Sequence, residues 1–171
     1  MNHFFSLHRT KFSAILIALS LSIFLASCKT ESDPKDFLPL GKWQDSFGSI
    51  YEISQTEFSN YSETYDSYAG NNLVISKSTD NSGYIYIQYT KAYCAEHSNL
   101  EDKYIYDNDS PDVGKWYAIS YKSLTASSIQ ISGAYKDGGE TSTETLEEAM
   151  AEFTIENGYF AMYSDCTKLS N

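Results

Sequence analysis

Residues 84–90 read Tyr84-Ile85-Tyr86-Ile87-Gln88-Tyr89-Thr90, a run in which aromatic and β-branched side chains alternate. Side chains of these types suit a pleated, half-buried surface, and alternation with period two predicts a β-strand. The preceding Asn81-Ser82-Gly83 has the composition of a turn. The stretch therefore predicts a strand of an antiparallel sheet that is entered through a tight turn.

Further strands are predicted on both sides of this run. Alternating residues from Trp43 to Ile53 indicate one strand, or two if Gly48 bends the chain. The same reasoning predicts strands over 56–61, 65–76, 115–122 and 127–133. Within 65–76, Gly70-Asn71-Asn72 is typical of a hairpin tip, and residues 99–112 are predicted to form a long acidic loop.

One helix is predicted, near the C-terminus. Thr141-Ser142-Thr143-Glu144 resembles a capping box, and apolar residues follow at helical spacing from Leu146 to Phe153. Asn157-Gly158 then lies between two apolar runs, and this dipeptide favours a hairpin because both turn positions take a positive φ. The pattern predicts a short helix that leads into a closing hairpin.

About 8 to 10 short strands with a single late helix predict an all-β fold, either an antiparallel sandwich or a closed barrel. Gly41-Lys42-Trp43, at the start of the first strand, resembles the G-x-W that opens the lipocalins and their calycin relatives. The resemblance implies an antiparallel up-and-down, lipocalin-like β-barrel over residues 38–171, with one short helix near the C-terminus and with Trp43 buried at its closed base. Gly41 would let the entering segment cross beneath the barrel.

The first 27 residues are typical of a lipoprotein signal peptide. Arg9 and Lys11 precede an apolar run over 12–24, which is shorter than the roughly 20 residues of a membrane span. The run ends in Leu25-Ala26-Ser27-Cys28, which resembles the bacterial lipobox, whose cysteine receives a diacylglycerol. The resemblance implies a lipid-modified Cys28 and, behind it, a polar tether over 28–37. The alternative is an ordinary signal peptide with a chance cysteine.

Composition and charge narrow the range of partners that the protein is expected to bind. The chain has 12 Lys and Arg against 23 Asp and Glu, a net charge of −11. Removal of residues 1–27 takes away two basic residues and no acid, which leaves a net charge of −13. Such a chain lacks the basic surface that binds nucleic acid, and it has no polybasic segment to assist membrane attachment. We therefore expect an exported protein held at the cell envelope by its lipid alone.

The residue after the lipobox cysteine bears on which membrane carries the protein. Lys29 is not the Asp that resembles an inner-membrane retention signal. We therefore expect the outer membrane in a cell that has one, with the periplasmic or surface side left open.

Two cysteines remain besides Cys28. In an exported chain, Cys94 and Cys166 are predicted to form a disulfide, which would close a loop of about 70 residues. One alternative is two free thiols. The other is a reactive thiol, because Cys94-Ala95-Glu96-His97 places a thiol, a carboxylate and an imidazole close together. The spacing matches no catalytic or zinc pattern.

No set of residues predicts catalysis, a metal or a cofactor. Asp107-Asn108-Asp109 and Asp112 carry oxygen ligands for Ca²⁺, but the EF-hand glycine and glutamate are missing. No G-x-S-x-G, phosphate-binding glycine loop or H-E-x-x-H occurs. We expect a protein that is not an enzyme.

Tyrosine is the unusual residue, with 15 copies, all of them after Cys28. Either the rings cover half-buried sheet, or some of them line a surface for a ligand or partner. The candidate residues for such a surface are Trp43, Tyr51, Tyr61, Tyr65, Tyr68, Tyr84 and Tyr86.

Two functions follow from these features. The first is a lipid-anchored cell-envelope lipoprotein that binds a small apolar ligand inside its β-barrel. The alternative is a surface-exposed structural or protein-interaction lipoprotein whose barrel is filled and holds no ligand.

Overall fold

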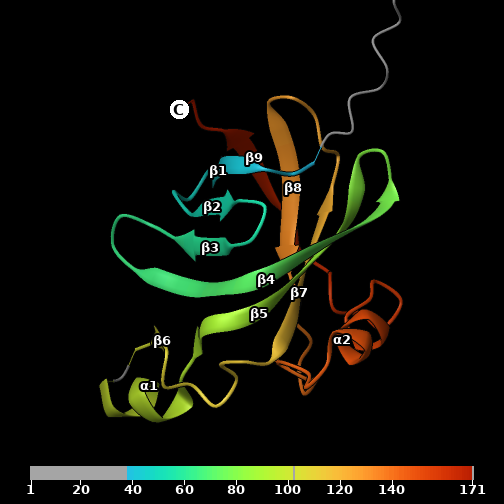
Figure 1. Cartoon of the computed structure of the whole chain (residues 1–171). Coiled ribbons are helices and arrows are strands. Elements are labelled where there is room, and N and C mark those ends of the chain that lie inside the picture. The colour runs from blue at the N-terminus through green and yellow to red at the C-terminus, as the bar shows by residue number, and fades with distance from the viewer. Residues whose placement is uncertain (1–37, 102, 171) are drawn as a thin grey trace, which may run out of the picture. The chain divides into compact units, whose positions relative to one another are not determined.

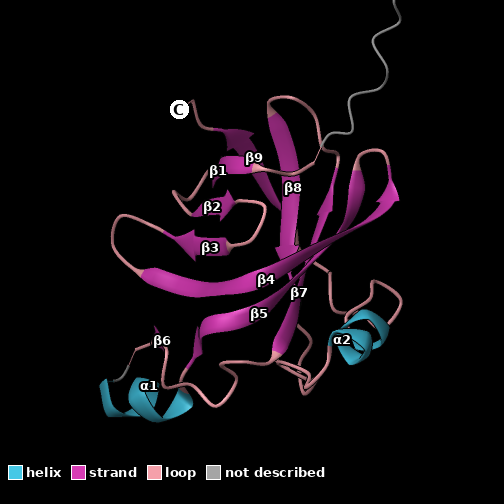
Figure 2. Ribbon diagram, in the orientation of Figure 1, coloured by secondary structure: helices cyan, strands magenta, loops and turns pink. Residues whose placement is uncertain are grey.

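The computed structural model describes residues 38–101 and 103–170, in which we find nine strands and two short helices (Figures 1 and 2). In chain order they are β1 (Gly41–Asp45), β2 (Ile50–Ile53), β3 (Phe58–Tyr61), β4 (Asp66–Thr79), β5 (Ser82–Tyr93), α1 (Ala95–Glu101), β6 (Tyr106–Asp107), β7 (Trp116–Lys122), β8 (Ser128–Gly133), α2 (Leu146–Glu152) and β9 (Ser164–Lys168). The predicted signal peptide, the Cys28 lipidation site and the 28–37 tether lie outside the described residues. Within the described part of the chain, no helix has the length and apolar character needed to cross a membrane.

All of these strands except β6 form a closed antiparallel barrel of eight strands. Each pairs with the strand before and after it, in the order β1-β2-β3-β4-β5-β7-β8-β9. The barrel closes between β1 and β9, where Trp43 lies opposite Lys168 and Asp45 opposite Cys166. The short β6 pairs only with the end of β5. Of the two all-β architectures that the strand pattern allows, the structure is the closed barrel, and the expected antiparallel up-and-down barrel is confirmed.

Large apolar side chains fill the interior of the barrel. Because side chains alternate between the two faces of a strand, every second residue points inward. The largest inward-facing side chains are less than 2% exposed: Trp43, Phe58, Ile85, Ile87, Ile119, Tyr121, Ile129 and Ile131. The run that begins at Tyr84 thus supplies Ile85 and Ile87 to the core.

Part of the outer face is also covered. Tyr86, Ala118 and Ser120 alternate with the inward-facing residues of β5 and β7 and are nevertheless buried. The helix α2 packs against these two strands, and the segment after it continues the cover. There Phe160 lies 5.6 Å from the Tyr84 ring, and the Tyr163 and Ser120 hydroxyls are 2.9 Å apart. Sheet and helix therefore share a second apolar layer outside the barrel.

The two ends of the barrel differ. The start of β1 lies at one end, which we call the hairpin end, together with the connections 54–57, 80–81 and 123–127. The other end, which we call the loop end, has the connections 46–49 and 62–65 and the two long connections, 94–115 and 134–163. Both helices follow strands that end there, and they lie on the same side of the barrel in Figure 1. Trp43 is buried near the hairpin end, and its Nε1 donates to the carbonyl of Pro39 at 2.9 Å.

Two predicted hairpin turns and one predicted loop are wrong. Gly70-Asn71-Asn72 is no hairpin tip: β4 runs through it, and Asn72, with φ of 51°, marks an irregularity in the pairing with β5. A Cβ on Gly70 would lie 2.9 Å from Cβ of Ile87, so the glycine lets β4 pass over β5. Asn157-Gly158 forms a turn without flanking strands, and the Asn157 side chain donates to the carbonyls of Ala151 and Glu152 at the end of α2.

The third wrong prediction concerns the expected acidic loop over 99–112. The helix α1 begins before it at Ala95, and β6 lies within it. The segment is structured because β6 adds two residues to the edge of β5, with Tyr106 opposite Tyr93 and Asp107 opposite Ala92.

Candidate functional site

The barrel interior has little room for a ligand. Toward the loop end its core is closed by aromatic rings: Tyr89 stacks on Tyr117 at 4.8 Å, and Tyr68 contacts Tyr117 edge-on at 5.3 Å. Phe153, which follows α2, packs against Tyr117 at 5.9 Å. Burial raises the pKa of Tyr68, Tyr89 and Tyr117 well above the ordinary value for tyrosine, so these rings are neutral.

A hollow lies at the mouth of the barrel, next to its interior. Tyr51, Gly133 and Ser164 are among the residues that line it, and its volume is about 160 Å³. Pockets for drug-sized molecules are typically about 300–1,000 Å³. This hollow is too small for such a ligand.

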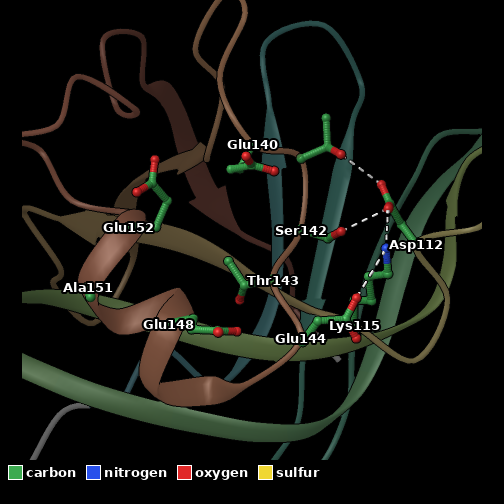
Figure 3. Close-up of a pocket in the computed structure, with 10 residues that line it drawn as sticks. Asp112, Lys115, Glu140, Ser142, Thr143, Glu144, Glu148, Ala151 and Glu152 are labelled. Atoms are coloured by element: carbon green, nitrogen blue, oxygen red, sulfur yellow. Dashed lines mark hydrogen bonds and ion pairs between the residues drawn. The ribbon is translucent and has the colours of Figure 1, made fainter.

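A groove lies outside the barrel, between α2, the segment 140–144 before it and the residues that precede β7 (Figure 3). Its volume is about 530 Å³. Asp112 accepts hydrogen bonds from Thr141 Oγ1 at 2.9 Å and from Ser142 Oγ at 2.8 Å. Lys115 Nζ lies 3.7 Å from Asp112 and 3.5 Å from Glu144, so it bridges the two walls of the groove.

Most of the other polar groups in this groove have structural partners. Glu148 accepts from the backbone N–H of Thr145 at 3.0 Å, and Glu152 accepts from the hydroxyl of Tyr159 at 2.6 Å. Burial and the bond to Glu152 together raise the pKa of Tyr159. These contacts hold the 140–145 segment against the start of β7 and the end of α2. The groove is acidic, with one lysine, and its geometry contains no paired acid and base aimed at a shared point.

A cluster of tyrosine rings at the loop end is exposed to solvent. Tyr65, Tyr93 and Tyr104 are 53%, 40% and 84% exposed, and the rings of Tyr104 and Tyr106 each lie 5.9 Å from Tyr93. Partial burial is the main cause of the raised pKa of Tyr106. A hydrogen bond to Ser67 acts against this rise, and the nearby Tyr65 adds to it. We call Tyr65, Tyr93, Tyr104 and Tyr106 the tyrosine surface.

The candidate surface residues named from the sequence do not form one surface. Trp43 lies in the core, and Tyr68 is partly buried and packs against the core. Tyr51 faces inward with its hydroxyl 3.5 Å from Ser164 Oγ. Tyr84 and Tyr86 lie beneath the cover formed by Phe160 and α2. Tyr61 stands on the outer face of β3 and donates to Glu52 at 3.1 Å.

Only Tyr65 joins the exposed cluster. Its neighbours Tyr93, Tyr104 and Tyr106 were missed because they fall in or beside the expected acidic loop. The spacing of three tyrosines within 14 residues was the available signal.

The predicted disulfide is not formed, which is a correction. Cys94 and Cys166 are both free and buried thiols. Cys166 faces the core from β9, between β1 and β8, whereas Cys94 follows β5, so β7 and β8 separate their strands around the barrel. Burial and the nearby Asp45 and Asp165 raise the pKa of Cys166 to about 12, so its thiol is protonated and unreactive.

Comparisons of the chain with protein-family models, with curated proteins and with solved structures find no match.

Proposed function

We propose that the protein is an exported lipoprotein, anchored through Cys28, whose filled barrel is a scaffold that presents the tyrosine surface to a protein partner. The observation that carries this proposal is the contrast between a core packed with large side chains and exposed rings at the loop end. Tyrosine dominates the energetics of many protein interfaces because it buries a large area with few rotatable bonds.

The end of the barrel at which the chain enters β1 supports the same proposal. The described residues begin at Leu38 and enter β1 at the hairpin end, whereas the tyrosine surface lies at the loop end. A lipid on Cys28 would therefore be joined to the hairpin end through the 28–37 tether. The tyrosine surface lies at the opposite end of the barrel from this attachment.

The partner's chemistry follows from charge. The chain after Cys28 has a net charge of −13. Near the tyrosines, Glu63 is an exposed acidic residue, whereas Asp66 and Glu101 pair with Lys91 and Lys103. A partner with basic residues around an apolar centre would complement this surface, and electrostatic attraction would speed its association at low salt. Nucleic acid is excluded as a partner by the same charge. The proposal assigns no catalytic residue.

The lipid anchor is tested by labelling growing cells with a fatty acid. We expect label in the native protein and in the Ser27→Ala variant, which keeps a small residue before the cysteine. The Cys28→Ala variant should carry none. Label in Cys28→Ala, or none in the native protein, would contradict the anchor.

The surface is tested by placing a photoreactive amino acid at Tyr104 in the full chain in intact cells. We expect a discrete cross-linked protein, and we expect its yield to fall when Tyr65 and Tyr93 are replaced by alanine. Tyr135, which is 71% exposed and outside the tyrosine surface, is the matched control position. Equal adducts at both positions would contradict the proposal. Recovery of a stoichiometric apolar molecule from the purified protein would instead favour the hollow-barrel function.

A further inference from the structure

Three potential metal ligands come together at the loop end, although they are spread over 14 residues of the sequence. Cys94 directly follows β5, His97 lies in α1, and Asp107 lies in β6. The backbone brings them together because β6 pairs with the end of β5, with Asp107 opposite Ala92. The N–H of Cys94 donates to the carbonyl of Ile105 at 2.9 Å, which ties the start of α1 to the residue before β6.

The side chains converge on one point. A sulfur of Cys94, a ring nitrogen of His97 and a carboxylate oxygen of Asp107 all lie within 4.8 Å of one another. Asp107 Oδ2 is 2.5 Å from His97 Nδ1, and its Oδ1 accepts the N–H of Asp109 at 3.0 Å. The cysteine is buried, whereas the side chains of His97 and Asp107 are 39% and 21% exposed, so the cluster is open to solvent on one side.

We propose that Cys94, His97 and Asp107 form a binding site for a zinc-type transition-metal ion, with Cys94 Sγ, one ring nitrogen of His97 and one carboxylate oxygen of Asp107 as ligands. Thiolate, imidazole and carboxylate are the three side-chain ligands of zinc sites. Three protein ligands with a solvent-facing side leave the fourth tetrahedral position to water or to a group from a partner.

The distances require only a small adjustment. With metal–ligand bonds of about 2.0–2.3 Å, tetrahedral ligand atoms are separated by roughly 3.3–3.8 Å. His97 and Asp107 must therefore move apart by about 1 Å as the ion replaces the proton that they share, and the sulfur must move closer by a similar amount. His97 and Asp107 are partly exposed and have space for this movement.

Other uses of these residues fit the geometry less well. Ca²⁺ takes six to eight oxygen ligands, and a thiol is not among them. A cysteine nucleophile needs its thiol hydrogen-bonded to the imidazole that removes its proton, and among the described residues the hydrogen bond of the His97 ring goes to Asp107. The remaining alternative is an ordinary His97–Asp107 ion pair next to a buried thiol, and this is the alternative that the experiment must exclude.

The site lies directly behind the tyrosine surface. Tyr93 precedes Cys94 and Tyr106 precedes Asp107, so a bound ion would fix the backbone that carries both rings. Metal binding would need only the three ligands and does not depend on the proposed partner.

The test is a titration of the full-length protein, purified in detergent, reduced and freed of metal with a chelator. One equivalent of Co²⁺ should produce a thiolate-to-cobalt charge-transfer band and the visible bands of a tetrahedral cobalt centre, and Zn²⁺ should then abolish both. We expect the Cys94→Ser variant to lack the charge-transfer band. Cys166→Ser, which removes the other buried cysteine, should retain it and is the matched control.

A second measurement covers the case in which Cys94→Ser fails to fold. His97→Gln changes a partly exposed side chain, and we expect it to weaken Zn²⁺ binding at least about tenfold in competition with a chromogenic chelator. No cobalt–thiolate band in the native protein would overturn the site. An unchanged band in a folded Cys94→Ser variant, or unchanged zinc affinity in His97→Gln, would do the same.

Discussion

Trp43 connects three parts of the chain through a single side chain. Its indole is 1% exposed in the barrel core, and its backbone lies opposite Tyr51 in β2 and Lys168 in β9. The Nε1 group donates to Pro39, and the ammonium group of Lys168 lies 5.0 Å from the ring centre. The residue therefore stabilises the seam where the first and last strands close the barrel.

Replacement of Trp43 by alanine should lower the free energy of unfolding by about 3–5 kcal/mol, because it removes a large buried ring and leaves a cavity. Urea denaturation followed by far-ultraviolet circular dichroism measures this loss. Trp116, which is only partly buried, is the control, and Trp116→Ala should cost less. A loss below about 1 kcal/mol in Trp43→Ala would show that the seam does not depend on this ring.

At the scale of the element, the helix α2 begins one turn later than its sequence pattern indicates. The pattern Thr-x-x-Glu occurs twice, at Thr141–Glu144 and at Thr145–Glu148, and only the second is the capping box. The first is held in extended form because the backbone groups of Thr143 exchange two hydrogen bonds with Trp116, at 2.8 and 2.9 Å. The two patterns are locally equivalent, and a contact with β7 selects between them.

The two capping candidates make different predictions. Thr145→Ala should destabilise the protein by about 1 kcal/mol, because Thr145 Oγ1 accepts the backbone N–H of Glu148 at 3.2 Å. Hydrogen exchange of that amide should become faster. Thr141→Ala, which loses only its bond to Asp112, should leave the exchange of the Glu148 amide unchanged. Faster exchange in Thr141→Ala alone would place the helix start where the first pattern indicated.

Across the whole molecule, the closed barrel and its cover bury several tyrosine hydroxyls and a cysteine thiol in their uncharged forms. Burial raises the pKa of Tyr68, Tyr89 and Tyr117, and it raises that of Tyr86 to about 12 and that of Cys166 to about 12. These groups ionise more readily in the unfolded chain than in the folded one. Their contribution to stability is therefore complete below the unfolded values and falls as the pH rises toward the folded values.

We therefore expect alkaline unfolding. Stability should be steady up to about pH 9, near the ordinary pKa of 9.0 for a thiol, and should fall as the pH approaches 12. In the samples followed by both methods, the part of the tyrosinate absorbance that comes from the buried rings should rise together with the loss of circular dichroism. Ionisation of most tyrosines with the fold intact would contradict the buried positions of these rings.

Local patterns predict the all-β class and the late helix, because alternation marks single strands and helical spacing after a Thr-x-x-Glu pattern marks a helix. The up-and-down order and the burial of Trp43 are expected from the resemblance of Gly41-Lys42-Trp43 to the lipocalin G-x-W. The packing of the barrel settles what local patterns leave open: large side chains fill the core, Cys94 and Cys166 lie apart, and Thr145 rather than Thr141 caps α2. It also brings Cys94 beside Asp107. The reason is that such contacts join residues distant in sequence, and their geometry depends on how all eight strands close into the barrel.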